Sequence, residues 1–330
     1  MIGRLRQSVR RLIRPTLHGV DRQAWYAERW RSAAADAGWT VLRDDPPFLD
    51  LIRSGVIVRT MGSDVGLDSH VTYRTAGNKP ETTRRLRAAG LTTPDSTELD
   101  ATDVRGLLRC VAAQDLAVVK PAAGTGGGAG VTVAPLGVAM TLRALRDAAA
   151  HTRRISVEPM IAGRVVRVLV LRDGVVDAVH RQPASVTGDG TSTVARLVEL
   201  ENARRSALGP LSTGFIGTGA DHLAALARAA SGRRAVPPVG TEIVVAGRSN
   251  TGSEHQSTRL TLSRRAADVA TRAAEAVGVQ LAGVDLVIDD AGEPVAVLEV
   301  NTGPGLHWHV LVDGEPADPF AAILDAVATR

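Results

Sequence analysis

The sequence predicts a mixed α+β protein of roughly two domains. The chain has 330 residues, and a prior of about 150 residues per domain gives two. Short β-branched runs alternate with helical patterns, and the runs 165–171 and 175–180 flank the turn dipeptide Asp173-Gly174. A glycine-rich loop also lies between two strand-like runs rather than before a helix. These patterns favour antiparallel hairpins with helices packed around them.

Helices are predicted where apolar residues recur at helical spacing. Three of them end at a glycine, which suits the residue after a helix: 21–38 at Gly38, 80–89 at Gly90 and 262–277 at Gly278. Four further helices are expected at 138–150, 192–205, 219–230 and 318–328.

Strands are predicted where short β-branched or apolar runs are bounded by turn residues. They are expected at 39–43, 55–60, 116–120, 131–134, 155–157, 165–171, 175–180, 242–246, 284–288 and 295–300. The last two are apolar and joined by a turn, so they should form an antiparallel pair.

The composition excludes several classes of protein. Hydrophobic residues make up 44% and charged residues 22%, which is ordinary for a globular chain and excludes global disorder. No apolar run is long enough to span a membrane. Aromatic residues make up 3% and charges of both signs are interspersed, so we expect no nucleic-acid partner. A single cysteine forbids an internal disulfide, so we expect a cytoplasmic protein.

The first 20 residues contain five arginines among apolar side chains, without the features of a secretory signal. We interpret this segment as an amphipathic arm that rests on the protein, rather than as a membrane-surface helix. Membrane binding is therefore not expected.

The basic residues carry a sharper signal. Only Lys79 and Lys120 are lysines among 39 basic residues, and the other 37 are arginine. A lysine that persists in such a chain is a candidate for work that needs a compact point charge rather than a planar fork.

The glycine loop follows Lys120 directly. A glycine backbone can approach phosphate oxygens closely and present N–H donors to them. A strand follows the loop, whereas dinucleotide-binding and P-loop motifs lead into a helix. The loop should therefore form a flap in a hairpin, with Lys120 reaching toward phosphates. The glycines expected to contact them are Gly124, Gly126, Gly127 and Gly128.

Three oxygen-bearing side chains gather near the C-terminus. In an antiparallel pair with a tight turn, Asp285 and Glu299 would lie at the same open strand end, and Asn301 would project on the side of Glu299. Hard oxygen donors of this kind suit Mg²⁺, with Mn²⁺ as an alternative. Two uncompensated carboxylates would repel each other, so a cation is implied.

Together these motifs resemble the ATP-grasp superfamily of carboxylate–amine ligases. The branch of cyanophycin synthetase and bifunctional glutathione synthetase is the most similar, and the resemblance covers about 70–310. Its most specific parts are GRVVRVLVLRDGVVDAVHRQPASVTGDGTSTVARLVELEN, RRAVPPVGTEIVVAGRSN and EVNTGPGL. The resemblance implies a short N-terminal region at 1–75 and an ATP-grasp domain at 76–330, divided into subdomains at 76–155 and 156–330.

The resemblance also implies roles for individual residues. Both lysines would contact the nucleotide. Glu158 would be the acidic hinge residue beside adenine, with the backbone of Met160 and Ile161 facing the base. Arg248 would lie near the transferred phosphoryl group, and Arg167 would occupy another basic position. The magnesium ligands would be Asp285, Glu299 and Asn301.

The chain departs from the branch at three places. Val165 replaces an acidic ribose ligand, and residues 250–254 read Asn-Thr-Gly-Ser-Glu where relatives often have Asn followed by Ser-Thr-Gly-Gly. His307 follows Pro-Gly-Leu where cyanophycin-type enzymes have arginine, so an acidic polymer substrate is not supported. His307 could bind a substrate carboxylate or deprotonate an incoming ammonium, or be merely solvated; His309 is more easily explained as a packed residue.

The expected activity is therefore ATP-dependent joining of a carboxylate to an amine, through an acyl phosphate and with release of ADP and phosphate. Expected partners are small amino acids or peptides, and a homodimer remains open. Two alternatives use the same fold: an inactive ATP-binding regulator and a phosphotransferase.

Overall fold

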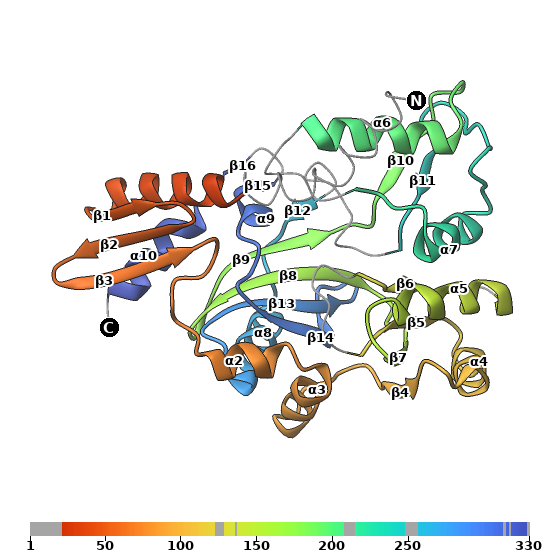
Figure 1. The fold of residues 1–330 in the computed structure, drawn as a ribbon, viewed down its shortest axis with the longest axis horizontal. Coiled ribbons are helices and arrows are strands. Elements are labelled where there is room, and N and C mark those ends of the chain that lie inside the picture. The colour runs from red at the N-terminus through yellow and green to blue at the C-terminus, as the bar shows by residue number, and fades with distance from the viewer. Residues whose placement is uncertain are drawn as a thin grey trace, which may run out of the picture.

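The computed structural model describes residues 22–122, 129–135, 137–207, 215–247, 257–312, 315–316 and 318–328. Within these ranges, no helix is both long and apolar enough to cross a membrane. Two sheets dominate the fold, a five-stranded sheet and a four-stranded sheet, and smaller units surround them (Figure 1).

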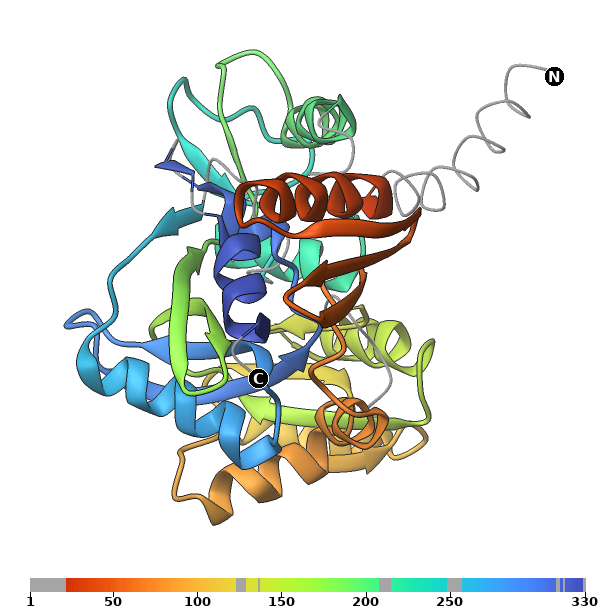
Figure 2. The same cartoon turned by 90° about the vertical axis from the view of Figure 1, so that its left-hand side faces the viewer.

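The two ends of the described chain pack together. Residues 22–36 are helical and lie over a small antiparallel sheet and the last helix (Figure 2). The sheet consists of β1 (Thr40–Asp45), β2 (Phe48–Arg53) and β3 (Val56–Met61), and the last helix is α10 (Pro319–Ala328). The ring centroids of Trp30 and Phe320, both fully buried, are 4.6 Å apart. This core ties the N-terminal helix to the C-terminal part of the fold.

The five-stranded sheet is antiparallel throughout and has the order β12-β9-β8-β13-β14. Its strands are β8 (Arg164–Leu171), β9 (Gly174–Arg181), β12 (Ser257–Arg259), β13 (Leu281–Ile288) and β14 (Pro294–Thr302). The Asp173-Gly174 hairpin and the pairing of the last two predicted strands are confirmed.

Three helices cover one face of this sheet. They are α2 (His70–Ala76), α3 (Lys79–Ala88) and α8 (Arg264–Val277). Helix α8 presents buried small residues such as Ala266 and Ala273 to Val168 and Val284 of the sheet. It ends at Gly278, whose φ of 84° is left-handed, as the sequence predicts.

The four-stranded sheet is also antiparallel, with the order β4-β7-β5-β6. Its strands are β4 (Thr97–Asp100), β5 (Ala117–Pro121), β6 (Thr132–Val133) and β7 (Arg154–Pro159). Helices α4 (Val104–Ala112) and α5 (Gly137–Ala149) pack on it around Leu107, Val119 and Ile155. Strands β5 and β6 pair directly, which confirms a hairpin rather than a strand-to-helix connection around the glycine segment.

A fourth core lies around β10 (Ser185–Thr187) and β11 (Glu242–Val244). It includes residues of α6 (Val194–Ala207) and α7 (Ala220–Arg228). The remaining elements follow β14: α9 (His307–Val310), β15 (Leu311–Val312) and β16 (Glu315–Pro316). Helix α9 is short, but it carries the two histidines that the sequence singles out.

Candidate active site

A cavity of about 630 Å³ lies where the two large sheets meet. Strands β5 and β7 supply one wall, and β8, β9, β13 and β14 supply another. Ten residues predicted from the sequence line it: Lys79, Lys120, Glu158, Met160, Ile161, Arg167, Asp285, Glu299, Asn301 and His307. The predicted Gly124, Gly126, Gly127, Gly128 and Arg248 lie outside the described residues.

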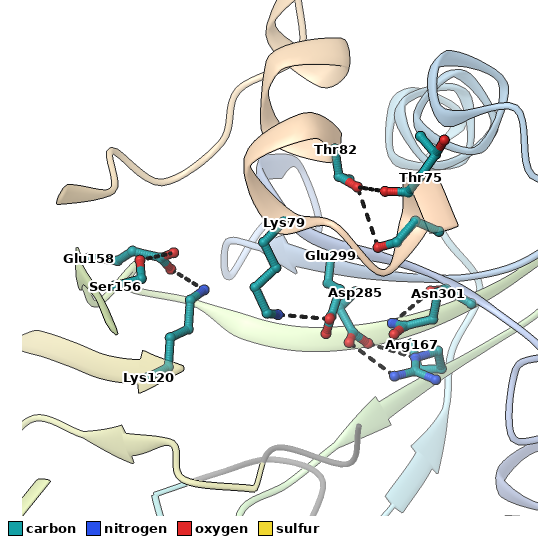
Figure 3. Close-up of polar contacts among 12 residues, drawn as sticks. Thr75, Lys79, Thr82, Lys120, Ser156, Glu158, Arg167, Asp285, Glu299 and Asn301 are labelled. Carbon is teal, nitrogen blue, oxygen red and sulfur yellow. Dashed lines mark hydrogen bonds and ion pairs between the residues drawn. The ribbon is translucent and has the colours of Figure 1, made fainter. Parts of the chain in front are cut away.

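The two acids of the predicted metal site are direct cross-strand neighbours. Asp285 on β13 pairs with Glu299 on β14, so their side chains project on the same face of the sheet (Figure 3). Both lie in the middle of their strands, which corrects the expectation of an open strand end. Asn301 follows two residues later, and its side-chain N–H donates to the Gly283 carbonyl at 3.2 Å. This bond leaves the amide oxygen of Asn301 for another partner.

The expectation that these carboxylates are uncompensated is wrong. Arg167 of β8 makes two hydrogen bonds to Asp285, with Nε to Oδ1 at 2.6 Å and Nη2 to Oδ2 at 3.0 Å. Lys79 Nζ donates to Glu299 Oε1 at 2.8 Å (Figure 3). Burial raises the pKa of Asp285, but the neighbouring Arg167 outweighs burial and holds that pKa below its usual value.

The start of helix α3 places Lys79 beside Glu299. Asn78 caps the helix by accepting the Glu81 backbone N–H at 3.2 Å, and Pro80 occupies the first turn. Thr82 Oγ1 donates to the Thr75 carbonyl at 3.1 Å and so ties α3 to α2. Burial opposes the charged form of Lys79, but Glu299 outweighs it and raises the pKa of the ammonium.

The donor set around Asp285 fits a magnesium ion only in part. The chain offers two carboxylates and one amide oxygen, which are ligands of the right kind. In the part of the chain that the structure describes, no group of three or more His, Cys, Asp or Glu side chains is placed to hold a metal. A metal at this point would share its carboxylates with Lys79 and Arg167, and it would need other oxygens, such as those of water or a phosphate.

A second ion pair lies on the four-stranded sheet. Lys120 Nζ donates to Glu158 Oε2 at 2.5 Å, and both side chains are 13% exposed. Ser156 Oγ donates to the other carboxylate oxygen at 3.2 Å. Lys120 and Glu158, which the sequence places in separate roles, are thus partners across β5 and β7.

One backbone N–H of the hinge after β7 is already hydrogen-bonded within the protein. The Met160 N–H already donates to the Leu116 carbonyl at 2.8 Å. Both residues line the cavity, and among the described residues the Met160 carbonyl and the backbone groups of Ile161 make no backbone hydrogen bond.

One end of the cavity, here called the arginine end, is formed by Arg22, Arg181, His307 and Trp308. Sequence reasoning found His307 but missed Arg22 and Arg181. The Arg181 guanidinium lies over the Trp308 ring, 4.3 Å from its centroid. Arg181 is 4% exposed, its Nε has no hydrogen-bond partner, and no described carboxylate forms an ion pair with it. Burial, and next Arg167, lower the pKa of Arg181. A buried cation of this kind calls for an anion.

The two histidines of α9 have different surroundings. His309 is fully buried away from the cavity lining, and its Nδ1 lies 2.8 Å from Asp177 Oδ2, so the packed interpretation holds for it. His307 lines the cavity, and its Nδ1 lies 3.0 Å from the Tyr26 hydroxyl. Burial, and next Arg22, hold the pKa of His307 well below its usual value, so the imidazole is neutral. An imidazole whose conjugate acid has so low a pKa is a weak base, which argues against deprotonation of an ammonium by His307.

Comparisons with known proteins agree with this geometry. A model of the RimK-like ATP-grasp domain matches residues 245–312, which include β13, β14 and the segment up to α9. The solved bifunctional glutathione synthetase from Pasteurella multocida superposes with a TM-score of 0.57 over 91% of this chain and 44% of that one, at 23% identity. The chain has the ATP-grasp fold.

Curated sequences extend the likeness of this ATP-grasp chain. The glutathione biosynthesis bifunctional protein GshAB of Desulfotalea psychrophila is 27% identical over 293 residues, which are 84% of this chain and 37% of that protein. A cyanophycin synthetase of Nostoc is 29% identical over 270 residues, covering 76% of this chain and 29% of that protein. The chain therefore spans about a third of the length of these relatives.

Proposed function

We propose that this ATP-grasp chain is a ligase that uses ATP to join a carboxylate to an amine, with amino acids or short peptides as substrates. One observation carries the proposal: a single cavity brings the only two lysines of the chain together with the Asp285–Glu299 pair. The curated relatives named above are amide-forming synthetases, which supports the same reaction class.

The chemistry needs charge control more than covalent help from the protein. A carboxylate is a poor acylating agent because oxide is a poor leaving group. Transfer of the γ-phosphoryl group of ATP to a carboxylate oxygen gives an acyl phosphate and ADP. The amine then attacks the acyl carbon, an amide forms, and phosphate leaves with the C–O electron pair. Positioning and charge neutralisation supply most of the rate enhancement in such reactions.

Each cluster in the cavity would serve one part of this reaction. Lys120 would hold nucleotide phosphates, and Glu158 keeps that lysine oriented until the nucleotide arrives. Lys79 would neutralise the phosphoryl group as it transfers. Arg181, buried and without an anionic partner among the described residues, would bind the anion that forms on the substrate side.

Asp285, Glu299 and Asn301 are the residues that would hold Mg²⁺. When bound, this ion would neutralise phosphate charge. Lys79 and Arg167 hydrogen-bond to Glu299 and Asp285 and so fix the direction of both carboxylates in its absence.

We also propose that the sheets mark the two subdomains of the ATP grasp. Strand β7 (Arg154–Pro159) crosses the boundary expected at 155/156 and belongs to the four-stranded sheet. Helix α3 packs with α8 on the five-stranded sheet, although it precedes the four-stranded one in sequence. The first subdomain is therefore better drawn from about 91 to 159.

The decisive experiment is incubation of the chain with Mg-ATP and a pooled set of amino acids and dipeptides. A ligase yields ADP, free phosphate and a condensed product visible by mass spectrometry. ADP with a phosphorylated product and no free phosphate would assign a phosphotransferase instead. Binding of ATP without ADP formation would assign an inactive regulator.

A further inference from the structure

The N-terminal helix reaches the cavity through one hydrogen bond. Tyr26 lies 281 positions before His307 in the sequence, yet its hydroxyl is 3.0 Å from the His307 Nδ1. The two rings meet edge to face with centroids 6.1 Å apart, and the tyrosine ring also contacts Trp25 and Phe320. The tyrosine is 4% exposed, so the surrounding core holds its hydroxyl in place.

The direction of this hydrogen bond follows from the other partners of the hydroxyl. The backbone N–H of His307 donates to the Tyr26 oxygen at 3.4 Å. Burial raises the pKa of Tyr26 to about 12, so the phenol keeps its proton at neutral pH. The oxygen accepts from the backbone N–H groups of His307 and Leu306, so the phenol is assigned as the donor to Nδ1. The ring proton is consequently assigned to Nε2.

The Nε2 of His307 has no hydrogen-bond partner among the described residues and is not sealed from solvent. The imidazole lines the cavity at its arginine end, next to Trp308, with ring centroids 5.3 Å apart. Gly305 allows this arrangement, because a Cβ there would lie 2.9 Å from His307 Cε1 and 2.8 Å from Trp308 Cδ1. The Nε2–H is thus a preorganised donor.

The charges around this donor are positive. Arg22, Arg181 and Arg167 all act electrostatically on His307, and all three line the same cavity. Arg181 carries no ion pair to the described residues, and Asp285 is occupied by Arg167. An uncharged donor surrounded by cations is well placed to bind a carboxylate. The carboxylate would accept a hydrogen bond from the imidazole and form an ion pair with a guanidinium.

We propose that Tyr26 is a positioning residue that fixes His307 as an Nε2–H donor, and that His307 and Arg181 together bind a carboxylate of the amino-acid or peptide substrate. This inference rests on the proposed ligase function and adds the class of group recognised at the arginine end. The carboxylate bound at the arginine end would contact His307 of α9. The N-terminal helix, which lies far before the residues matched by the RimK-like domain model, thereby takes part in substrate recognition.

The first test measures the imidazole directly. Protein labelled with ¹⁵N-histidine is examined by long-range ¹H–¹⁵N correlation, and His307→Gln identifies the His307 signals. We expect a neutral Nε2–H tautomer in the wild type and a mixture of tautomers in Tyr26→Phe. A wild-type ring protonated on Nδ1, or a Tyr26→Phe spectrum identical to the wild type, overturns the inference.

The second test measures carboxylate binding with N-acetylglycine as the probe, and its methylamide as the uncharged control. N-acetylglycine should shift the His307 signals saturably, while the methylamide should not. We expect the affinity for N-acetylglycine to fall roughly tenfold in Tyr26→Phe and in His307→Ala. Because His307→Ala has no imidazole at this position, its affinity is measured from the indole signal of Trp308 in protein labelled with ¹⁵N-tryptophan. His307→Gln, whose amide N–H can replace Nε2–H, should recover most of the affinity.

Trp30→Phe is the matched control. It removes the indole hydrogen bond to the Gly62 carbonyl, 2.7 Å long, from the same helix and the same core without touching the cavity lining. Its affinity should equal that of the wild type, and an equal loss there would overturn the positioning role. If the protein shows ligase turnover but N-acetylglycine does not shift the His307 signals, the inference is overturned and the proposed function stands. Carboxylate binding without turnover overturns the proposed function alone.

Discussion

Lys79 and Glu299 lie 220 positions apart in the sequence and form a 2.8 Å ion pair in the cavity. The pair joins helix α3 to strand β14, and Glu299 in turn faces Asp285 across the sheet. Each acid thus has its own cation, Lys79 for Glu299 and Arg167 for Asp285. The two acids are thus charge-balanced before any ligand binds, so a ligand of these carboxylates must compete with Lys79 and Arg167 or join them.

We predict that Glu299→Gln removes most ligase turnover while the protein remains folded. The amide keeps the shape of the side chain but leaves Lys79 without its partner and weakens any magnesium site. A loss of about a hundredfold or more in kcat is expected, which corresponds to roughly 2.7 kcal/mol. ADP release is the measurement. Glu293→Gln, one residue before β14, should behave as the wild type, and near-normal rates in Glu299→Gln would refute the assignment.

Lys120 should not be replaceable by arginine, despite the preference of this chain for arginine. Its ammonium fits beside Glu158 with only 13% of the side chain exposed, and a guanidinium is larger and planar. We expect Lys120→Arg to lose about tenfold in kcat/KM, or about 1.4 kcal/mol, with the KM for ATP raised. The control is Arg153→Lys, on an exposed ion pair with Asp100. Full activity of Lys120→Arg would show that the scarcity of lysine has no functional meaning.

The elements with strong local signals were predictable from the sequence. The Asp173-Gly174 turn, the glycine that ends α8 and the β13–β14 pair all follow from patterns within a short window. Strand β2 was missed, although its alternation buries Leu49 and Leu51, because its polar positions interrupt a run of only six residues. Helix α4 was missed although it has an Asp103 cap.

The candidate site also contains residues that the sequence predicts and residues that it does not. The lysines and acids could be found because their residue types are rare or their spacing is regular. Their partners could not, because the ion pair of Arg167 with Asp285 spans 118 positions and the contact of Tyr26 with His307 spans 281. No local pattern reports which cation will meet which acid. The sequence therefore indicates the reacting groups better than it indicates their charge balance.

The buried Asp177–His309 pair predicts a loss of stability in mild acid. Burial lowers the pKa of His309 below its unfolded value, although Asp177 acts in the opposite direction. The unfolded chain then binds more protons as pH falls below about 6.5, so the stabilisation is complete above that pH and is lost as pH falls through the lower folded pKa. The slope reaches at most about 1.4 kcal/mol per pH unit for each such proton.

Urea denaturation at pH 7.5, 6.5 and 5.5 measures this effect. His309→Gln should lower stability at pH 7.5 and flatten the dependence of the free energy of unfolding on pH. His70→Gln, on a described residue that is exposed at the start of α2, is the control and should leave the slope unchanged. An unaltered slope in His309→Gln would place the acid sensitivity at another group.

Arg181 gives the prediction in which stability and activity change in opposite directions. The residue is 4% exposed, and its guanidinium stacks on Trp308 and has no carboxylate partner among the described residues. The folded protein therefore carries the desolvation cost of an uncompensated cation. Arg181→Met keeps much of the side-chain volume and removes that charge. We expect the melting temperature to stay the same or to rise. The KM for the carboxylate substrate should rise at least tenfold, a loss of about 1.4 kcal/mol in binding, and the KM for ATP should change little.

Arg181→Lys keeps the charge but loses the planar stack, so it should recover part of the affinity. Thermal unfolding and steady-state kinetics of both variants distinguish substrate binding by Arg181 from a structural role. A lower melting temperature, together with equal increases in the KM for ATP and for the carboxylate substrate, would mean that Arg181 supports the fold rather than binding the substrate anion.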